Sequence, residues 1–418
     1  MTTVSRRTLL AAATASALFG ASTHAKAASA RATSLKSITA GVPGIAAQEH
    51  AARVARVQAS MRQRKIGALL LDAGSTLAYF TGVRWPRSER TTAALIPADG
   101  DVVIVMPFFE EPSVRETLQI AADVRPWKED ESPFALLARA LGERAAAEGP
   151  LAIEATTRFF IIDSMTRTAG IGRSVVPGED LVQACRMRKT AAELALLQAA
   201  NNVTIAALRH VHRQVDAGMR ASDIRDLMTA ATEALGGSDV WSLVLLNEAS
   251  AYPHGSIKPQ TVRKGSMILI DTGCAVHGYQ SDISRSWVFG EPSSRQRDVW
   301  SMVKRGQEIA LETARIGSPV GLIDEAVRTF YEDKGWTKNY GLPGLSHRTG
   351  HGIGMDGHEA PYLVRSDVTP LEAGMCFSDE PGIYIPGEFG VRLEDCWFMT
   401  EHGPQLFTPL AKSIEQPI

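Results

Sequence analysis

The feature that most constrains the fold is a repeated pattern in which an apolar run ends on an acid, the chain turns, and a second acid follows. The two copies are ILIDTGCAVHGYQSD, residues 268–282, and DEPGIYIPGEFGVRLED, residues 379–395. The acids are Asp271 and Asp282 in the first copy and Glu380 and Glu394 in the second. Turn residues between strand-like runs predict β-hairpins that would hold each pair of carboxylates together. Without a cation beside them, one carboxylate of a close pair would keep its proton. Surface acids flanking an ordinary turn are the alternative.

Between the two copies lies HRTGHGIGMDGHEAP, residues 347–361, which holds three of the ten histidines of the chain. His351 stands among glycines, which let its backbone approach neighbouring segments closely. Four carboxylates and one imidazole form an oxygen-rich ligand set that suits two divalent ions. Mn²⁺ is the expected ion, and Co²⁺, Fe²⁺ or Zn²⁺ would also fit. A structural zinc site would use thiolates instead.

These segments resemble the pita-bread metallopeptidases (family M24), in particular the branch with aminopeptidase P, prolidase and creatinase. The resemblance covers roughly residues 48–410 and also rests on STLAYFTG, MRKTAAELALLQAA and YPHGS. It implies that the metal ligands are Asp271, Asp282, His351, Glu380 and Glu394. It further implies that two metals share a bridging hydroxide, which attacks a peptide carbonyl.

The resemblance also implies roles beside the ligands. Glu380 would be both ligand and acid/base, while His358 and His254 would hydrogen-bond the substrate or its reacting carbonyl. His347 would contact the substrate, or would only orient a ligand. Arg392, two residues before Glu394, would balance charge or contact the substrate, and a structural salt bridge is an equal alternative.

The expected fold class is α+β, with an N-terminal creatinase-like α/β domain followed by a C-terminal pita-bread domain with pseudo-twofold halves. The domains are expected over residues 47–180 and 186–418. In the second domain, apolar spacing predicts helices over residues 222–235, 294–316 and 320–334.

The N-terminus has the pattern of an export signal over residues 1–27. Arg6 and Arg7 precede an apolar stretch, and Ala25-Lys26-Ala27 fits a cleavage site. The paired arginines resemble a twin-arginine signal, with an ordinary secretory signal as the alternative. A periplasmic or secreted location is therefore expected. Residues 28–46, rich in small and polar residues, are expected to be a linker.

Composition and charge exclude several classes of partner. Hydrophobic residues make up 44% of the 418 residues and charged residues 22%, which is globular composition. The net charge is −2 and long basic runs are absent from the sequence, which argues against nucleic acid or an anionic membrane surface as a partner. After the signal no apolar run of membrane-spanning length is expected. The four cysteines are expected to be small buried hydrophobes.

The substrate is less constrained than the metal site. The N-terminal domain argues against methionine aminopeptidase, and the complete ligand set argues against creatinase chemistry. Hydrolysis of the Xaa-Pro bond remains, in dipeptides or at the N-terminus of longer peptides, so a small peptide is the expected partner. A small-molecule metalloenzyme on the same fold, such as a dimethylsulfoniopropionate lyase or another amide or ester hydrolase, is the alternative. A non-catalytic binding module is more remote, because such modules tend to lose metal ligands.

The resemblance also implies a homodimer or homotetramer in which a neighbour's N-terminal loop reaches the active site. RWPRSER, residues 84–90, is the candidate loop because it joins an aromatic side chain to several cations. Simple surface exposure is the alternative explanation of this composition.

Overall fold

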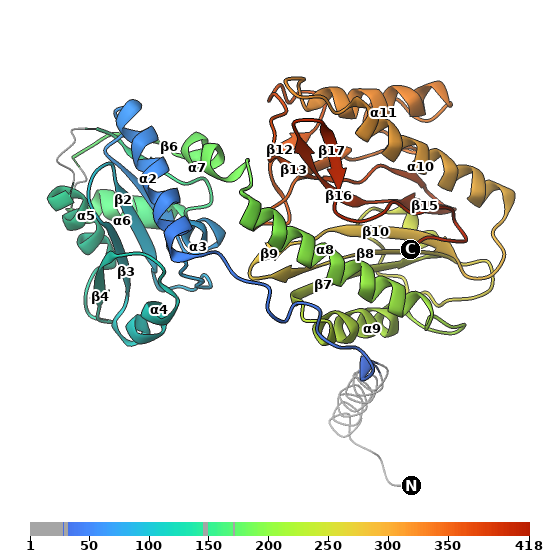
Figure 1. Ribbon diagram of the computed structural model, residues 1–418, viewed down its shortest axis with the longest axis horizontal. Helices are drawn as coiled ribbons and strands as arrows, with labels where there is room; N and C mark the ends of the chain where they lie inside the picture. Colours follow the sequence, from blue (N-terminus) through green and yellow to red (C-terminus); the bar gives the residue numbers. More distant parts are fainter. Residues whose placement is uncertain (1–27, 29–31, 145–148, 170–171) are drawn as a thin grey trace, which may run out of the picture. The chain divides into compact units, whose positions relative to one another are not determined.

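The computed structural model describes residues 28, 32–144, 149–169 and 172–418, which divide into two compact units (Figure 1). The first unit spans residues 43–188, and the second spans residues 189–418 together with the segment that ends at Val42. The export signal predicted for residues 1–27 lies outside the described residues.

The first unit is built on one six-stranded sheet in the order β4-β3-β2-β1-β5-β6. The strands are β1 (Ala68–Asp72), β2 (Ala93–Pro97), β3 (Val102–Pro107), β4 (Ala122–Trp127), β5 (Leu151–Ile153) and β6 (Val175–Pro177). β2 pairs antiparallel with β1 and β3, while the β3–β4, β1–β5 and β5–β6 pairs are parallel. Gly100 turns the β2–β3 hairpin with a φ of 93°, a conformation that favours glycine.

Helices surround this sheet and complete its core. They are α2 (Ala47–Gln63), α3 (Ser75–Thr81), η1 (Phe108–Glu110), α4 (Glu111–Thr117), α5 (Pro133–Arg144), α6 (Phe159–Ala169) and α7 (Glu179–Arg186). Leu70, Leu95 and Val103 from the strands pack with Leu137 of α5 and Ile161 of α6 in one buried cluster. The mixed sheet with its helices is the α/β unit that the sequence predicts.

The second unit consists of two similar halves, each with a helix pair and an antiparallel sheet. The first half contains α8 (Ala191–His212), α9 (Ala221–Ala234), β7 (Ser238–Leu246), η2 (Asn247–Ala251), β8 (Met267–Val276), β9 (Tyr279–Gln280) and β10 (Ile283–Val288). The second half contains α10 (Ser294–Thr313), α11 (Gly321–Asp333), β11 (Gly350–Gly352), β12 (Glu359–Leu363), β13 (Cys376–Asp379), β14 (Gly382–Ile385), β15 (Phe389–Arg392), β16 (Asp395–Thr400) and β17 (Gly403–Leu406). The sheet orders are β10-β8-β7, with β9 on β8, and β12-β11-β13-β16-β17, while β14 and β15 form a separate hairpin. The predicted α+β organisation is confirmed, and the helices lie where the apolar spacing predicts them.

The longest helix of the second unit, α8, begins at a capping box. The Thr190 side chain accepts a hydrogen bond from the backbone of Glu193, whose carboxylate accepts one from the backbone of Thr190. By length and composition α8 could cross a membrane, contrary to the expectation from the sequence. However, 56% of its apolar window is buried within the fold, as in the core helix of a globular protein.

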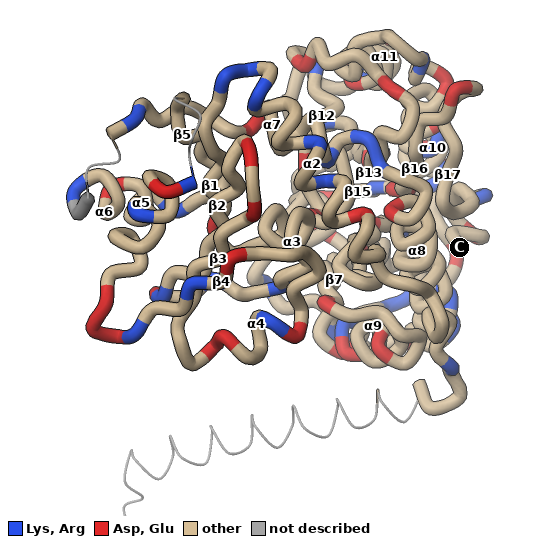
Figure 2. Tube along the Cα trace, turned by 60° about the vertical axis from the view of Figure 1, so that its left-hand side comes forward, with Lys and Arg blue, Asp and Glu red and all other residues tan. Residues whose placement is uncertain are grey.

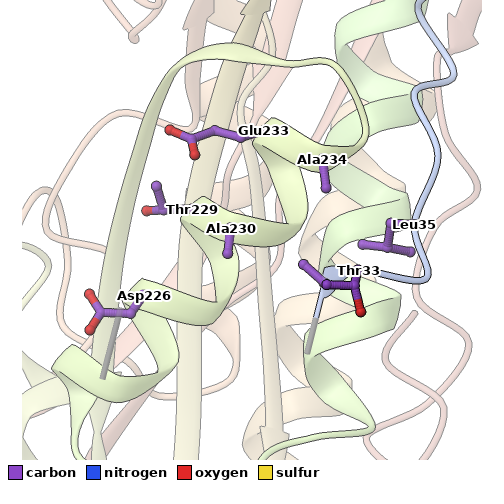
Figure 3. A pocket seen from close by; sticks show the side chains of 8 residues that line it. Thr33, Leu35, Asp226, Thr229, Ala230, Glu233 and Ala234 are labelled. Atoms are coloured by element: carbon purple, nitrogen blue, oxygen red, sulfur yellow. The ribbon is translucent and has the colours of Figure 1, made fainter. Parts of the chain in front are cut away.

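The segment expected to be a linker is instead packed along the second unit from residue 32 to residue 42. Ile38 N donates to Leu235 O at 2.9 Å, and the Thr39 hydroxyl donates to Gly236 O at 3.0 Å. Figure 3 shows a pocket between this segment and α9, with Thr33 and Leu35 on one side. Composition could not predict this packing, because the backbone groups at the end of α9 become partners only in the fold.

Charge and cysteine usage agree with the sequence expectations. Acidic and basic positions are interspersed over both units (Figure 2). All four cysteines are buried and free.

Candidate metal centre

The five predicted ligands lie in, or directly beside, strands of the second unit. Asp271 lies in β8, Asp282 directly precedes β10, His351 lies in β11, Glu380 directly follows β13 and Glu394 directly precedes β16. Because β8 and β10 pair antiparallel, Ser284 stands opposite Asp271. The Ser284 hydroxyl lies 2.9 Å from Asp271 Oδ1 and 2.7 Å from Glu394 Oε2, and so links the two halves of the unit.

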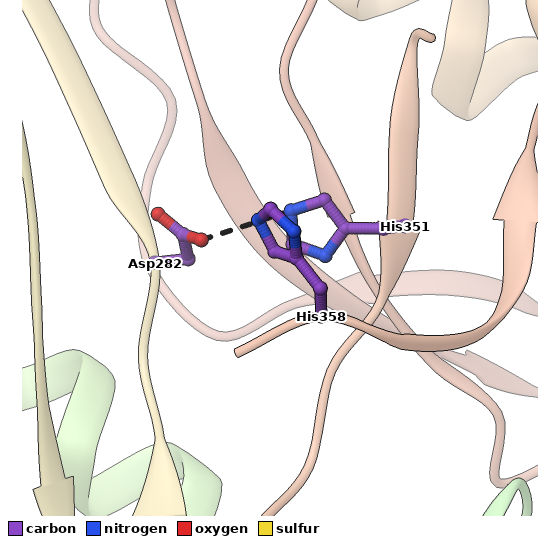
Figure 4. A group of neighbouring side chains, drawn as sticks. All are labelled: Asp282, His351 and His358. Atoms are coloured by element: carbon purple, nitrogen blue, oxygen red, sulfur yellow. Dashed lines mark ion pairs between the residues drawn. The ribbon is translucent and has the colours of Figure 1, made fainter. Parts of the chain in front are cut away.

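The ligand atoms of these residues converge on one place. Three groups have their ligand atoms within 4.8 Å of one another: Asp271, Asp282 and Glu394; His351, Glu380 and Glu394; and Asp282, His351 and His358. Figure 4 shows Asp282 facing His351, whose Nε2 lies 3.7 Å from Asp282 Oδ2. The same nitrogen lies 3.6 Å from Glu380 Oε1. The structure therefore brings all five predicted ligands together.

The electrostatics of this cluster call for a cation. Burial, followed by repulsion from the other carboxylates, raises the pKa of Asp282 and of Glu394 well above the usual range. Burial raises the pKa of Glu380 to about 7, although Arg392 opposes the rise. Asp282 Oδ1 and His351 Nε2 are buried without a hydrogen-bond partner among the described residues. Divalent ions would supply both the missing charge and the missing partners, so the residues fit metal ions.

His351 is also in the right protonation state for a ligand. Burial, with His358 nearby, lowers the pKa of His351 well below its usual value, so its ring is neutral. Its Nδ1 lies 3.1 Å from the carbonyl oxygen of Gly352, which can only accept a hydrogen bond, so Nδ1 carries the proton. The lone pair of Nε2 therefore points at the carboxylates, as metal coordination requires.

Arg392 forms the salt bridge that the sequence left as one of three alternatives. Arg392 is 3% exposed, and its guanidinium donates to Asp271 Oδ2 at 2.6 Å. It also donates to the Ser284 hydroxyl at 2.9 Å and to the Tyr384 hydroxyl at 2.9 Å. One buried cation therefore fixes the orientation of a predicted ligand.

His347 is hydrogen-bonded to the same Tyr384 hydroxyl that Arg392 contacts, and its ring is neutral. Burial, with Arg392 nearby, lowers the pKa of His347 to about 3. Its Nδ1 donates to the carbonyl oxygen of Arg348 at 2.8 Å, so its Nε2 accepts from the Tyr384 hydroxyl at 2.7 Å. His347 Nδ1 also lies 3.8 Å from Glu380 Oε2. These contacts orient the ring against both Tyr384 and Glu380.

A cavity of about 800 Å³ opens over the ligands, and His254 and His358 both line it. The ring of His358 lies 3.9 Å from that of His351, centre to centre. Arg348 donates to His358 Nδ1 at 3.1 Å, so a neutral His358 carries its proton on Nε2. The nearness of His358 to Asp282 makes it a potential further ligand, a possibility that the sequence did not raise.

Sequence reasoning missed Ser284, Tyr384 and Arg348. Ser284 and Tyr384 belong to strand runs that read as ordinary core, and their partners lie far away in the chain. Arg348 belongs to the histidine segment, residues 347–361, so its position in the sequence already indicated that it lies near the site.

The remaining lining of the cavity is largely apolar and includes Trp241, Leu243, Pro253, Tyr340 and Val364.

Comparisons with known proteins agree with this geometry. Residues 195–401 match the model of metallopeptidase family M24, and residues 53–188 match the creatinase/prolidase N-terminal domain. The chain is 31% identical over 365 residues to a probable dipeptidase, PepE, from Mycobacterium bovis, covering 85% of this chain and 94% of that protein. It is 29% identical to an Xaa-Pro dipeptidase from Lactobacillus helveticus, over 81% of this chain and 92% of the other. The crystal structure of dipeptidase PepE from Mycobacterium ulcerans superposes with a TM-score of 0.80 at 31% identity, covering 88% of this chain and 97% of that one. The chain thus belongs to metallopeptidase family M24 and is a metal-dependent peptidase with the pita-bread fold.

Proposed function

We propose that the protein hydrolyses the Xaa-Pro bond in dipeptides or at the N-terminus of short peptides. The observation that carries this proposal is the convergence of the five ligands in one cavity that His254, His358 and Arg348 also line. Relatives named as dipeptidases and as Xaa-Pro dipeptidases support the substrate class.

The proposed ligands are Asp271, Asp282, His351, Glu380 and Glu394, holding two divalent ions, for which we propose Mn²⁺. When bound, the ions would activate the attacking water and polarise the scissile carbonyl. The chain itself would hold the ligands in place through Arg392 and Ser284, which fix both oxygens of Asp271. This preorganisation keeps the geometry constant while the substrate binds.

Proton transfer is assigned to residues of the cavity wall. Glu380 takes a proton from the attacking water and delivers it to the leaving nitrogen. His358, which carries its proton on Nε2, donates to the carbonyl oxygen as negative charge develops there. Such a donor contributes about 2.7–4 kcal/mol to the transition state. His254, which lines the cavity from the loop after η2, would hydrogen-bond the substrate.

Hydrolysis assays with Leu-Pro and with Leu-Pro-Gly test the proposal, using the Mn²⁺-loaded protein and Glu380→Gln as the inactive control. Cleavage of Leu-Pro alone would identify a dipeptidase, and cleavage of Leu-Pro-Gly would identify an aminopeptidase P type of activity. If neither is cleaved although two metals are bound, the Xaa-Pro assignment fails. A small-molecule substrate, as of a lyase or another amide hydrolase, then becomes the better explanation.

We further propose export through the twin-arginine route and assembly as a homodimer or homotetramer. The twin-arginine pattern of residues 1–27 supports the export route, and the resemblance to the prolidase branch supports the assembly.

In the candidate loop, residues 84–90, Trp85 Nε1 donates a hydrogen bond to Glu110 Oε2 at 3.0 Å, which would fix the indole ring. If the loop serves a neighbouring site, Trp85→Ala should raise KM while the metal content stays the same. Fractionation of cells and light scattering test the location and the subunit number.

A further inference from the structure

Gly357 stands in the cavity wall directly before His358 and is a glycine that the fold does not require. The other glycines of the segment, Gly350, Gly352 and Gly354, have no room for a side chain, because a Cβ there would come within 2.1 to 2.4 Å of a neighbouring atom. A Cβ at Gly357 would meet no atom within 4 Å. The φ of Gly357 lies outside the left-handed range, so other residues could adopt its conformation. Neither backbone nor packing explains the missing side chain, and because Gly357 lines the cavity, the space beside it is available to a bound ligand.

The part of a dipeptide that would reach Gly357 follows from the charges of the cavity. The scissile carbonyl has to lie beside the ligands, and the free carboxylate has to be matched by a cation. Arg348 is half-buried in the wall, stacks 4.4 Å over the Tyr362 ring and donates to His358. Within the described part of the chain Arg348 makes no ion pair with an acid. The C-terminal residue of a dipeptide, which bears the carboxylate, is therefore drawn to the side of Arg348, His358 and Gly357.

The walls of the cavity favour an apolar side chain in this space. Tyr340 and Val364 line the cavity together with Gly357, and Trp241 and Leu243 of β7 line it as well. Because Gly357 contributes no side chain, the space is not limited to a residue as compact as proline.

We propose that Gly357 opens the subsite for the C-terminal residue, so that the enzyme also cleaves dipeptides that end in a bulky apolar residue such as leucine or phenylalanine. This inference rests on the proposed dipeptidase function and extends it beyond Xaa-Pro. Gly357 is the specificity-determining position: a β-branched side chain there would occupy the space and restrict the site to smaller C-terminal residues.

The test compares kcat/KM for Leu-Phe and Leu-Pro in the Mn²⁺-loaded wild type, Gly357→Val and Gly357→Ala. Gly142→Ala is the matched control, because a Cβ at Gly142 of α5 also meets no atom within 4 Å and lies outside the cavity. We expect the wild type to cleave both dipeptides. We expect Gly357→Val to lower the ratio of kcat/KM for Leu-Phe over Leu-Pro by at least about tenfold, with Gly357→Ala in between and Gly142→Ala unchanged. Calorimetric binding of Leu-Phe to Glu380→Gln with and without Gly357→Val gives a second readout, in which the added valine should weaken binding by a similar factor.

The outcomes separate this inference from the proposed function. If the wild type cleaves Leu-Pro but not Leu-Phe, the proposal that the subsite accepts bulky C-terminal residues is wrong, while the Xaa-Pro activity stands. If it cleaves Leu-Phe but not Leu-Pro, the Xaa-Pro assignment is wrong while the open subsite stands. An unchanged ratio in Gly357→Val, with normal metal content and melting temperature, would show that Gly357 does not set specificity.

Discussion

Replacing Glu380 by glutamine should stabilise the metal-free protein above neutral pH, because the wild-type carboxylate is buried beside other acids. Burial raises the pKa of Glu380 from 4.5 to about 7, with Arg392 opposing the rise and Asp271 adding to it. At a pH well below 4.5 the group is protonated in both the native and the unfolded protein. As the pH rises from 4.5 to about 7, Glu380 loses its proton in the unfolded chain but keeps it in the native protein. The free energy of unfolding of the wild type therefore falls over this range. At about 1.36 kcal/mol per pKa unit, the full loss is about 3 kcal/mol, reached just above the native pKa.

Urea unfolding of the EDTA-treated wild type and Glu380→Gln, from about pH 4.5 to about pH 8, measures this difference. The two proteins should have similar free energies of unfolding at the acidic end, and the variant should be more stable by about 3 kcal/mol at the alkaline end. Added Mn²⁺ should reverse the order, because the ion binds the ionised carboxylate and stabilises the native wild type. Parallel pH profiles of the two metal-free proteins would refute the reasoning, since Glu380 would then not be a buried acid with a raised pKa.

Three further experiments test single contacts of the second unit. Arg392→Leu removes the buried partner of Asp271, which should destabilise the protein by about 3–5 kcal/mol and weaken Mn²⁺ binding; chemical unfolding and titration calorimetry check this. His358→Ala should lower kcat about 10²–10³-fold at unchanged metal content, and a loss of metal by elemental analysis would instead make His358 a ligand. Lys189→Met breaks the ion pair of Lys189 Nζ with Glu359 at 2.6 Å, where the two side chains are 2% and 11% exposed. It should lower stability by about 3–5 kcal/mol, and adding Glu359→Gln should restore part of it, because the buried carboxylate that lost the Lys189 ammonium is then neutralised.

The local sequence contains enough information to propose the five ligands that the structure brings together. In each hairpin the two carboxylates are close in the chain, and the glycine-rich segment presents His351 between the hairpins. Metal coordination needs particular side chains at fixed spacings, and such spacings are visible without a fold. The helices of the second unit and its two similar halves could be predicted for the same reason, since apolar periodicity is a local property.

Contacts between distant segments could not be predicted in this way. The Ser284 hydroxyl reaches Glu394, 110 residues away, because β10 lies beside the segment that precedes β16. Arg392 lies 121 residues from Asp271, so the sequence could not separate a salt bridge from a substrate contact. The packing of residues 32–42 on the second unit depends on hydrogen-bond partners that exist only once α9 has formed.

The sequence by itself therefore determined which groups are proposed to bind the metal and which fold class carries them. Only the tertiary structure decided how those groups are oriented: which nitrogen of His351 is free, which oxygen of Asp271 is held, and that Gly357 faces open space. The physical reason is that residue type and spacing fix the chemistry available along a few residues of chain. Orientation, burial and protonation depend on neighbours that strand pairing brings together from more than a hundred residues away.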